Sequence, residues 1–242
     1  MFEKRFSVYL VSRSVLEKRL AFYAGEDVLW DRTSRDVRHV VRLSSGREEA
    51  CAGVYEGLLR DFGPFLVRAG DDDFVPALLN RLRKERLVLV TAESCTGGLI
   101  AKLLTDVPGS SDVVWGAFVT YANDAKTRLL GVREDTLNRY GAVSRETVEA
   151  MTAGALEASG AGAAVAVSGV AGPGGGSAEK PVGSVWAGAR LSCGKHVERF
   201  FRFPPPRGRV RDLSAWAALF LLECLVSQGD ETLDILIPLD YI

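Results

Sequence analysis

The 242-residue sequence is poor in the features that mark several special classes of protein. It has only two histidines and four scattered cysteines, with no C-x-x-C pair: Cys51, Cys95, Cys193 and Cys224. We therefore expect neither a disulfide framework nor a zinc site, and we expect reduced thiols. No apolar run approaches the ~20 residues that span a bilayer, and the first residues lack the pattern of a secretory signal. These absences predict a cytoplasmic protein with no membrane partner.

An excess of charge of one sign is also absent. Thirty Lys and Arg residues oppose 31 Asp and Glu residues, which gives a formal net charge of −1. No block of like charges is long enough for a nucleic-acid tail, so we expect no nucleic-acid partner. Hydrophobic residues make up 47% of the chain and charged residues 25%, the composition of an ordinary globular protein with one large domain or two small ones.

The acidic turn Gly70-Asp71-Asp72-Asp73 divides the chain into two predicted domains. In residues 1–70 the apolar periodicity predicts the order β-α-β-β-α-β, which is typical of small ferredoxin-like α+β domains. These predicted elements cover residues 6–11, 14–23, 27–30, 37–43, 47–62 and 65–68. RNA-binding domains share the order, but the central strand, Arg38 to Leu43, lacks the aromatic residues on which bases stack.

The second predicted domain covers residues 71–242 and alternates strands with helices. Its predicted helices cover 74–84, 123–130, 144–158 and 207–227, and its strands cover 86–91, 113–121, 163–168, 182–191 and 196–203. Because the strands are continuously apolar, helices should cover both faces of the sheet, which predicts an α/β/α layered fold. The apolar tail after Asp230 could dock on the protein or add a strand.

The stretch TAESCTGG, residues 91–98, places polar side chains at the end of a predicted buried strand. A helix beginning at Thr96 would aim free N–H groups at the surroundings of Ser94, which favours an anion or an oxyanion there. Serine at such a turn is typical of acyl-transfer nucleophiles. Alternatively, Ser94 and Thr96 are helix N-caps and Glu93 is a surface or capping carboxylate. Cys95 is a second candidate nucleophile, although an isolated cysteine beside a strand is more often a small buried hydrophobe.

A nucleophilic serine needs a base, and few candidates are available. His39 and His196 both lie inside predicted strands, so a Ser-His-Asp triad is not expected. Ser177 to Lys180 matches S-x-x-K, but the flanking glycines and proline indicate a loop. Lys126 in TYANDAK is the better candidate, because a strand end and a helix start place it near Tyr121. This role requires a buried site that lowers the lysine pKa; otherwise the pair is a strand-end aromatic and a solvated charge.

Two further stretches could bind a substrate. SGVAGPGGG, Ser168 to Gly176, fits neither the P-loop nor the dinucleotide fingerprint, but its backbone offers hydrogen-bond donors. Arg207-Gly-Arg-Val-Arg211 stands at a predicted helix start, where it could bind a phosphate monoester or form a solvated basic turn.

Several of these stretches together resemble the C-terminal domain of the CinA (competence-damage-inducible protein) family, the nicotinamide-nucleotide amidases. The matching strings are TAESCTGGLIAKLLTDVPGSS, TYANDAKTRLLGV, YGAVSRETVEAM, SGVAGPGGGSAEKPVGSVW and PPRGRVR, and they cover nearly all of residues 74–228 in order. Residues 1–70 resemble the family's small linker domain by pattern more than by letters. The large nucleotide-processing domain of longer members has no counterpart in this sequence, so we expect no pyrophosphatase activity.

The resemblance implies hydrolysis of nicotinamide mononucleotide to nicotinic acid mononucleotide and ammonia, without a metal or cofactor and commonly in a homodimer. It implies Ser94 as nucleophile, Lys126 as base and Tyr121 as their assistant. The implied oxyanion donors are the N–H groups of Cys95, Thr96 and Gly97. The implied substrate-binding residues are Glu93, Asn123, Ser168, Gly169, Gly172, Gly175 and Arg207. Two alternatives stay open: a non-catalytic nucleotide-binding or regulatory module, and an amidase for another carboxamide.

Overall fold

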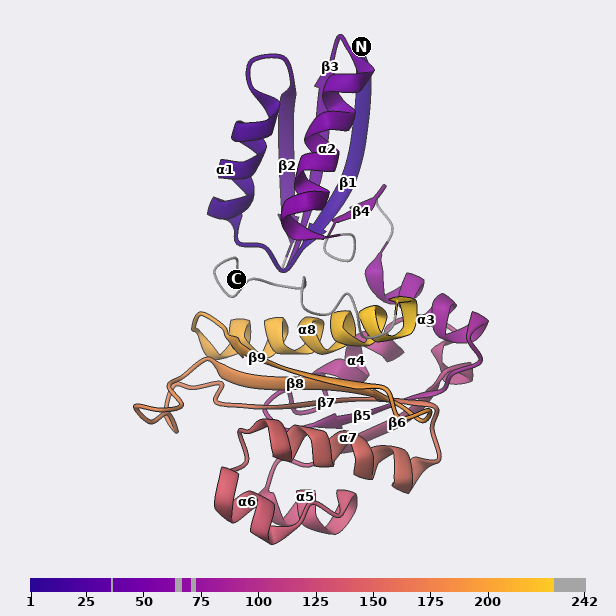
Figure 1. Cartoon of the computed structure of the whole chain (residues 1–242), viewed down its shortest axis with the longest axis vertical. Helices are drawn as coiled ribbons and strands as arrows, with labels where there is room; N and C mark the ends of the chain where they lie inside the picture. Colours follow the sequence, from indigo (N-terminus) through magenta and orange to yellow (C-terminus); the bar gives the residue numbers. More distant parts are fainter. Residues whose placement is uncertain (36, 64–66, 71–72, 229–242) are drawn as a thin grey trace. The chain divides into compact units, whose positions relative to one another are not determined.

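A computed structural model describes residues 1–35, 37–63, 67–70 and 73–228 (Figure 1). These residues form two compact units, which divide between Asp73 and Phe74. The first unit contains a four-stranded sheet and the second contains a five-stranded sheet. The division lies next to the acidic turn at which the sequence predicts a domain boundary.

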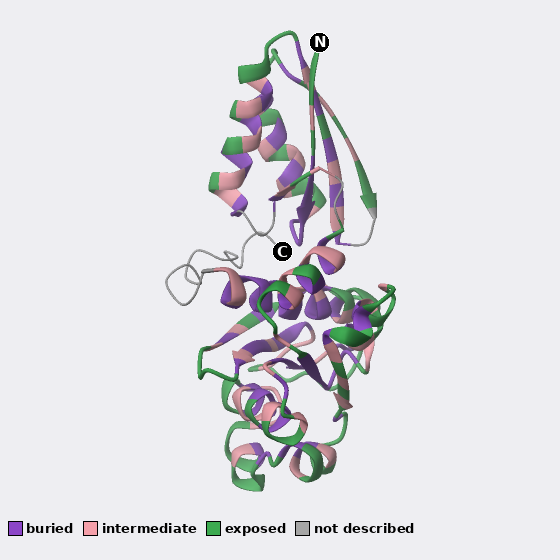
Figure 2. Cartoon of the chain, turned by 90° about the vertical axis from the view of Figure 1, so that its right-hand side faces the viewer, coloured by how far each residue is buried: buried purple, intermediate pink, exposed green. Residues whose placement is uncertain are grey.

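The first unit has the element order β-α-β-β-α-β. Its elements are β1 (Phe2–Tyr9), α1 (Arg13–Ala24), β2 (Leu29–Arg35), β3 (Arg38–Ser45), α2 (Glu48–Phe62) and β4 (Val67–Ala69). The strand order is β2-β3-β1-β4, and every neighbouring pair is antiparallel. Both helices lie on the same face of this sheet (Figure 2). The structure confirms the ferredoxin-like α+β prediction for this unit.

Strand β2 is longer than the sequence predicts. Apolar residues mark a strand only over 27–30, and the following residues are polar. In the structure β2 pairs with β3 along a full hairpin, from Leu29 opposite Ser44 to Arg35 opposite Arg38. Pairing across the hairpin therefore maintains the strand where the apolar pattern stops.

The second unit alternates strands and helices from Phe74 onward. Its helices are α3 (Phe74–Lys84), α4 (Leu99–Thr105), α5 (Asn123–Leu130), α6 (Glu134–Tyr140), α7 (Arg145–Ser159) and α8 (Arg207–Gln228), with a 3₁₀ turn, η1 (Ser110–Asp112). Its strands are β5 (Leu89–Glu93), β6 (Val114–Val119), β7 (Ala163–Gly169), β8 (Ser184–Leu191) and β9 (His196–Arg202). The predicted hairpin around Cys193 is the β8-β9 connection.

The five strands form one mixed sheet between two helical layers. The strand order is β6-β5-β7-β8-β9, with β6, β5 and β7 parallel and β8 and β9 antiparallel. Helix α7 packs on one face, and α4 and α8 pack on the other (Figure 1). All of β5 and nearly all of β7 are buried, because they occupy the middle of the sheet (Figure 2). The structure confirms the α/β/α layered prediction.

The second unit differs from the sequence prediction at one helix start and contains one helix that the sequence did not indicate. Helix α4 begins at Leu99 rather than at Thr96. Gly97 and Gly98 have φ angles of 59° and 94°, a left-handed conformation that glycine adopts easily and that cannot belong to a helix. Helix α6 was not predicted, since its seven residues carry few apolar positions and only Leu137 is buried.

Two sequence predictions concern long or terminal apolar segments. In the part of the chain that the structure describes, no helix combines the length and the apolarity needed to cross a membrane. The apolar tail after Asp230, which could dock or add a strand, lies outside the described residues.

Candidate active site

Three parallel strands end at the same edge of the second sheet. β5 ends at Glu93, β6 at Val119 and β7 at Gly169. The chain leads from β5 to β6 on one side and from β7 to β8 on the other, so these connections diverge between β5 and β7, which is where α/β sheets form ligand crevices. Ser94 directly follows β5, and Tyr121 lies just beyond β6. This edge therefore brings together candidates that are far apart in the sequence.

The residues after β5 form a tight turn that fixes Ser94. The N–H of Gly97 donates to the carbonyl of Ser94 across 3.1 Å, and the N–H of Ser94 donates to the carbonyl of Val167 across 3.0 Å. The N–H groups of Cys95 and Thr96 donate to no backbone carbonyl in the described part of the chain, although the N–H of Cys95 also lies against its own thiol. Of the three expected oxyanion donors, only Gly97 is occupied by a carbonyl of the turn.

Glu93 caps helix α4 from inside the protein. Its carboxylate is fully buried and accepts hydrogen bonds of 2.8 to 3.1 Å from the hydroxyl of Thr91 and the N–H groups of Gly98, Ile100 and Ala101. The helix N–H groups therefore face Glu93, and the expectation that they face Ser94 is wrong. The capping interpretation of Glu93 holds and the surface interpretation does not, and Glu93 is not among the residues that line the cavity beside Ser94.

Lys126 joins Ser94 in a buried hydrogen-bonded pair. Its Nζ lies 3.1 Å from Ser94 Oγ and donates to the carbonyls of Thr120 at 2.8 Å and Tyr121 at 3.4 Å. Only 1% of Lys126 is exposed, and no carboxylate among the described residues pairs with it. A neutral amine has two N–H bonds, which the two carbonyls accept, and one lone pair, which is left for the Ser94 hydroxyl proton. The alternative of a solvated helix charge is wrong.

Burial shifts the pKa values of the two candidate groups beside Ser94, the Lys126 amine and the Cys95 thiol. It lowers the pKa of Lys126 to about 8. About one Lys126 in ten is then neutral at pH 7, against roughly 0.04% of ordinary lysines. Burial also raises the pKa of the Cys95 thiol to about 12, so this thiol stays protonated and unreactive. The environment favours Ser94 with Lys126 as the reactive pair and agrees with Cys95 as a small buried hydrophobe.

A cavity of about 290 Å³ opens beside this pair. Ten of the expected site residues line it: Ser94, Cys95, Tyr121, Asn123, Lys126, Ser168, Gly169, Gly172, Gly175 and Arg207. Three others do not: Glu93, Thr96 and Gly97. Val170, Ala171 and Gly174 also line it and lie within the expected stretch Ser168 to Gly176, whereas Ala142 and Val143 are lining residues that the sequence did not single out. Small apolar residues carry no chemical signal of their own, although Ala142 and Val143 lie within the family string YGAVSRETVEAM.

Arg207 is the cavity-lining residue that is farthest from Ser94 in the sequence, and it lies on the first turn of α8. Its guanidinium donates to the carbonyl of Gly172 at 2.8 Å and to the Tyr121 hydroxyl at 3.2 Å. A Cβ on Gly172 would lie 2.6 Å from a Val182 methyl, so glycine is required for this close approach. Tyr121 contacts Lys126 through its carbonyl, while its hydroxyl accepts from Arg207. The Tyr121 side chain is thus part of the cavity wall.

The remaining base candidates have structural partners. His39 lies in β3 and His196 in β9, where His196 Nδ1 is 3.0 Å from a Glu198 carboxylate oxygen. Lys180 lies in a loop, as its sequence context predicts, and donates to the carbonyl of Tyr140 at 2.7 Å. Among the described residues, no group of three or more His, Cys, Asp or Glu side chains is arranged to hold a metal ion.

Residues 72–226 match the family model described as the CinA C-terminal domain. The CinA-like protein of Akkermansia muciniphila is 48% identical over 157 residues, which are 65% of this chain and 38% of that protein. The CinA-like protein of Mycobacterium marinum is 42% identical over 193 residues, which are 80% of this chain and 45% of that protein. The chain thus matches less than half the length of these relatives.

Solved structures of competence-damage (CinA) proteins share the fold of the second unit. The competence/damage inducible protein CihA from Agrobacterium tumefaciens is 46% identical with a TM-score of 0.60, and the match covers 64% of this chain and 96% of that one. A competence-damaged protein (CinA) superfamily protein from Escherichia coli is 33% identical with a TM-score of 0.60, over 65% of this chain and 94% of that one.

Proposed function

The chain belongs to the CinA family, and from this premise and the site geometry we propose that it hydrolyses the carboxamide of nicotinamide mononucleotide. The products would be nicotinic acid mononucleotide and ammonia. One observation carries the proposal above all: the buried Lys126 amine, with no carboxylate partner among the described residues, lies 3.1 Å from the Ser94 hydroxyl. This is the arrangement that activates a serine without a histidine.

The reaction follows from the groups around Ser94. Neutral Lys126 takes the hydroxyl proton while Ser94 Oγ bonds to the carboxamide carbon, and the negative charge moves to the carbonyl oxygen. The N–H groups of Cys95 and Thr96 stabilise this oxyanion. When the C–N bond breaks, protonated Lys126 returns the proton and ammonia leaves. Water then attacks the ester with Lys126 again as base, which releases the carboxylic acid and restores the serine.

The rest of the cavity suits the nucleotide part of this substrate. Arg207 provides a guanidinium on the cavity wall for a phosphate monoester. The loop from Ser168 to Gly175 and the side chain of Asn123 offer polar groups for the ribose. Each step uses only side chains and backbone N–H groups of this chain and water.

The decisive experiment measures ammonia release by the purified protein. Wild type and Cys95→Ala are expected to release ammonia from nicotinamide mononucleotide, and Ser94→Ala is expected to release none. Nicotinamide tests the need for the ribose phosphate, and asparagine tests another carboxamide. A folded wild type that binds the mononucleotide without releasing ammonia would favour a binding or regulatory module, and release from asparagine alone would favour another amidase.

A further inference from the structure

Arg211 connects helix α8 to the turn that holds the candidate nucleophile. Its Nε donates to the carbonyl of Cys95 at 3.1 Å, and its Nη2 donates to the carbonyl of Thr96 at 2.5 Å. The side chain is half-buried, and no carboxylate among the described residues pairs with it. A full positive charge is therefore directed at two consecutive peptide groups next to Ser94.

These two peptide groups include an expected oxyanion donor. The carbonyl of Cys95 and the N–H of Thr96 belong to the same peptide, so a cation on the carbonyl draws electron density from the N–H and makes it a stronger donor. The N–H two residues after a serine is the group that serine's own side-chain oxygen reaches in a compact turn. For the N–H of Thr96 to act as an oxyanion donor, the carbonyl oxygen of an acyl group on Ser94 must turn toward this side of the turn, which Thr96 reaches from behind the cavity lining.

Arg207 and Arg211 stand one helical turn apart on α8 and do different things. Arg207 lines the cavity, whereas Arg211 does not and acts behind the turn. A Cβ on Gly97 would lie 3.6 Å from Arg211 Nη2, so the guanidinium packs directly against the turn's backbone. Arg211 also acts on the electrostatics of the turn, since its charge opposes the burial that raises the pKa of Cys95.

We propose that Arg211 is a positioning residue that fixes the Ser94–Gly97 turn and strengthens the N–H of Thr96 as an oxyanion donor. This role rests on the proposed hydrolysis at Ser94. It predicts that Arg211 acts on the transition state and not on substrate affinity, because it touches the peptide groups and not the cavity.

The test compares Arg211→Met and Arg211→Lys with Arg209→Met, which removes an exposed arginine of the same helix turn. With nicotinamide mononucleotide, Arg211→Met is expected to lower kcat by about 10- to 100-fold, since a weakened donor costs less than a deleted one. KM should stay within about threefold, Arg211→Lys should recover part of kcat through one hydrogen bond, and Arg209→Met should match wild type.

A second readout does not depend on the amide substrate. Diisopropyl fluorophosphate phosphorylates an activated serine: the Ser94 Oγ–P bond forms, the P–F bond breaks, fluoride leaves, and Lys126 takes the hydroxyl proton. Its phosphoryl oxygen needs the same donors as the oxyanion. Mass spectrometry is expected to show Ser94 labelling slowed in Arg211→Met by the same factor as kcat, and slowed less in Arg211→Lys.

The outcomes separate this proposal from the proposed function. If wild type is labelled at Ser94 but releases no ammonia, the amidase proposal fails and the labelling rates alone decide the role of Arg211. Equal labelling in wild type and Arg211→Met would overturn that role, as would the absence of Ser94 labelling in wild type. A rise in KM matching the whole loss of kcat/KM would show a structural effect instead. If Arg211→Met does not fold, Arg211→Lys carries the same comparison.

Discussion

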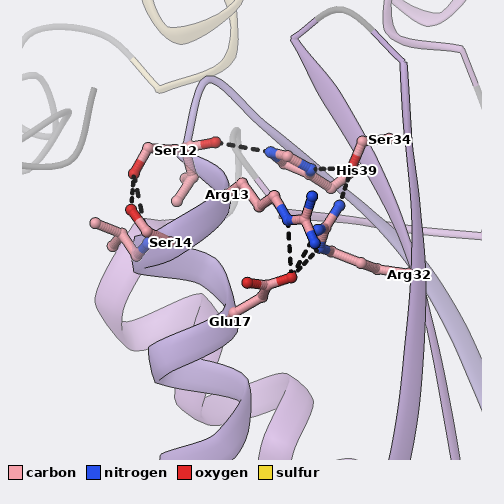
Figure 3. Close-up of polar contacts among 9 residues, drawn as sticks. Ser12, Arg13, Ser14, Glu17, Arg32, Ser34 and His39 are labelled. Atoms are coloured by element: carbon pink, nitrogen blue, oxygen red, sulfur yellow. Dashed lines mark hydrogen bonds and ion pairs between the residues drawn. The ribbon is translucent and has the colours of Figure 1, made fainter.

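Each of the two units contains a serine hydroxyl beside a basic side chain, but only one of these pairs is arranged for chemistry. In the second unit Ser94 lies 3.1 Å from Lys126. In the first unit Ser34 Oγ lies 2.7 Å from His39 Nδ1 (Figure 3). By distance and residue type alone, the serine-histidine pair would be the more conventional choice.

The surroundings of the serine-histidine pair give both groups structural partners. His39 Nε2 lies 2.8 Å from the carbonyl of Val11, so both ring nitrogens are occupied. Ser34 stands opposite His39 across the β2-β3 hairpin and is exposed. Figure 3 also shows Arg13 and Arg32 directed at the carboxylate of Glu17, which is thus paired with two guanidinium groups. The pair therefore secures the hairpin.

The surroundings of Ser94 differ, because no acidic side chain among the described residues neutralises its base, Lys126. Lys126 is buried, and burial lowers its pKa. Its side chain lines a cavity of about 290 Å³. Ser34 lines neither of the cavities described in the structure, both of which belong to the second unit. A reactive serine is therefore distinguished by a buried base without a counter-charge and by room for a substrate, rather than by a short hydroxyl-base distance.

The largest expected difference between the two serines is in activity. Ser94→Ala removes the nucleophile and is expected to lower ammonia release by about 10⁴-fold or more. Ser34→Ala removes only a hairpin hydrogen bond and should leave kcat/KM unchanged. Steady-state assays of both variants with nicotinamide mononucleotide test the comparison, and a loss of activity in Ser34→Ala would contradict it.

The pKa of Lys126 predicts a pH profile. Since the neutral amine is the base, kcat/KM should rise about tenfold per pH unit and level off above a pKa of about 8, so activity at pH 6 is about 100-fold below the plateau. A profile with its midpoint near 6.5 would indicate a histidine instead. His39→Gln is the matched control and should leave the profile unchanged.

The lowered pKa of Lys126 also makes the stability of the protein depend on pH. Unfolded Lys126 has an ordinary pKa near 10.4, so between about pH 8 and pH 10 the unfolded chain binds more protons than the folded protein. This group therefore makes the free energy of unfolding rise with pH in that window, and its full destabilising effect is present below pH 8. Lys126→Met should abolish the rise in urea unfolding measured between pH 7 and pH 10.

Two glutamates, one in each unit, are expected to differ in their contribution to stability. Glu93 is buried and accepts four hydrogen bonds, so Glu93→Gln places an amide N–H₂ group against N–H donors and should cost about 2–4 kcal/mol. The Glu17 side chain is 35% exposed, and hydrogen bonds from Arg32 and Arg13 lower its pKa, but solvent partly screens these pairs. Glu17→Gln should shift unfolding very little. Equal shifts in chemical unfolding would contradict the distinction.

The smallest predicted effect concerns a glycine in helix α2 of the first unit. A Cβ on Gly53 meets no atom within 4 Å, so Gly53→Ala should raise the free energy of unfolding of this unit by about 0.5–1 kcal/mol. In the same helix, a Cβ on Gly57 would lie 2.6 Å from the Tyr23 ring, so Gly57→Ala should have the opposite sign. Thermal unfolding measures both changes, and activity should not follow them.

The sequence predicted the elements with strong apolar periods and missed those that depend on pairing or on turns. Helices α3 and α5 occur at their predicted residues because their apolar faces repeat at helical spacing. The extension of β2 depends on its pairing with β3. The start of α4 depends on the left-handed conformation of Gly97 and Gly98, which a sequence permits but does not require.

The candidate site shows the same division. Residue types and spacing indicated Ser94, Lys126 and Arg207, and the family strings supported them. They could not show that Glu93 would take the helix N–H groups, because that capping requires the carboxylate to fold inward across the turn. Nor could they distinguish Arg207 from Arg211, whose partners come from different segments.

The sequence alone indicated the strongly periodic elements, the two-layered and three-layered folds and the residues able to do chemistry, since these follow from local periodicity and side-chain type. Only the tertiary structure decided which of these residues are reactive. The pKa of Lys126, the pairing of Glu17 with Arg32 and the contact of Arg211 with the serine turn all depend on burial or on partners distant in sequence. Desolvation and electrostatic pairing are properties of the folded environment, which no single segment of the sequence contains.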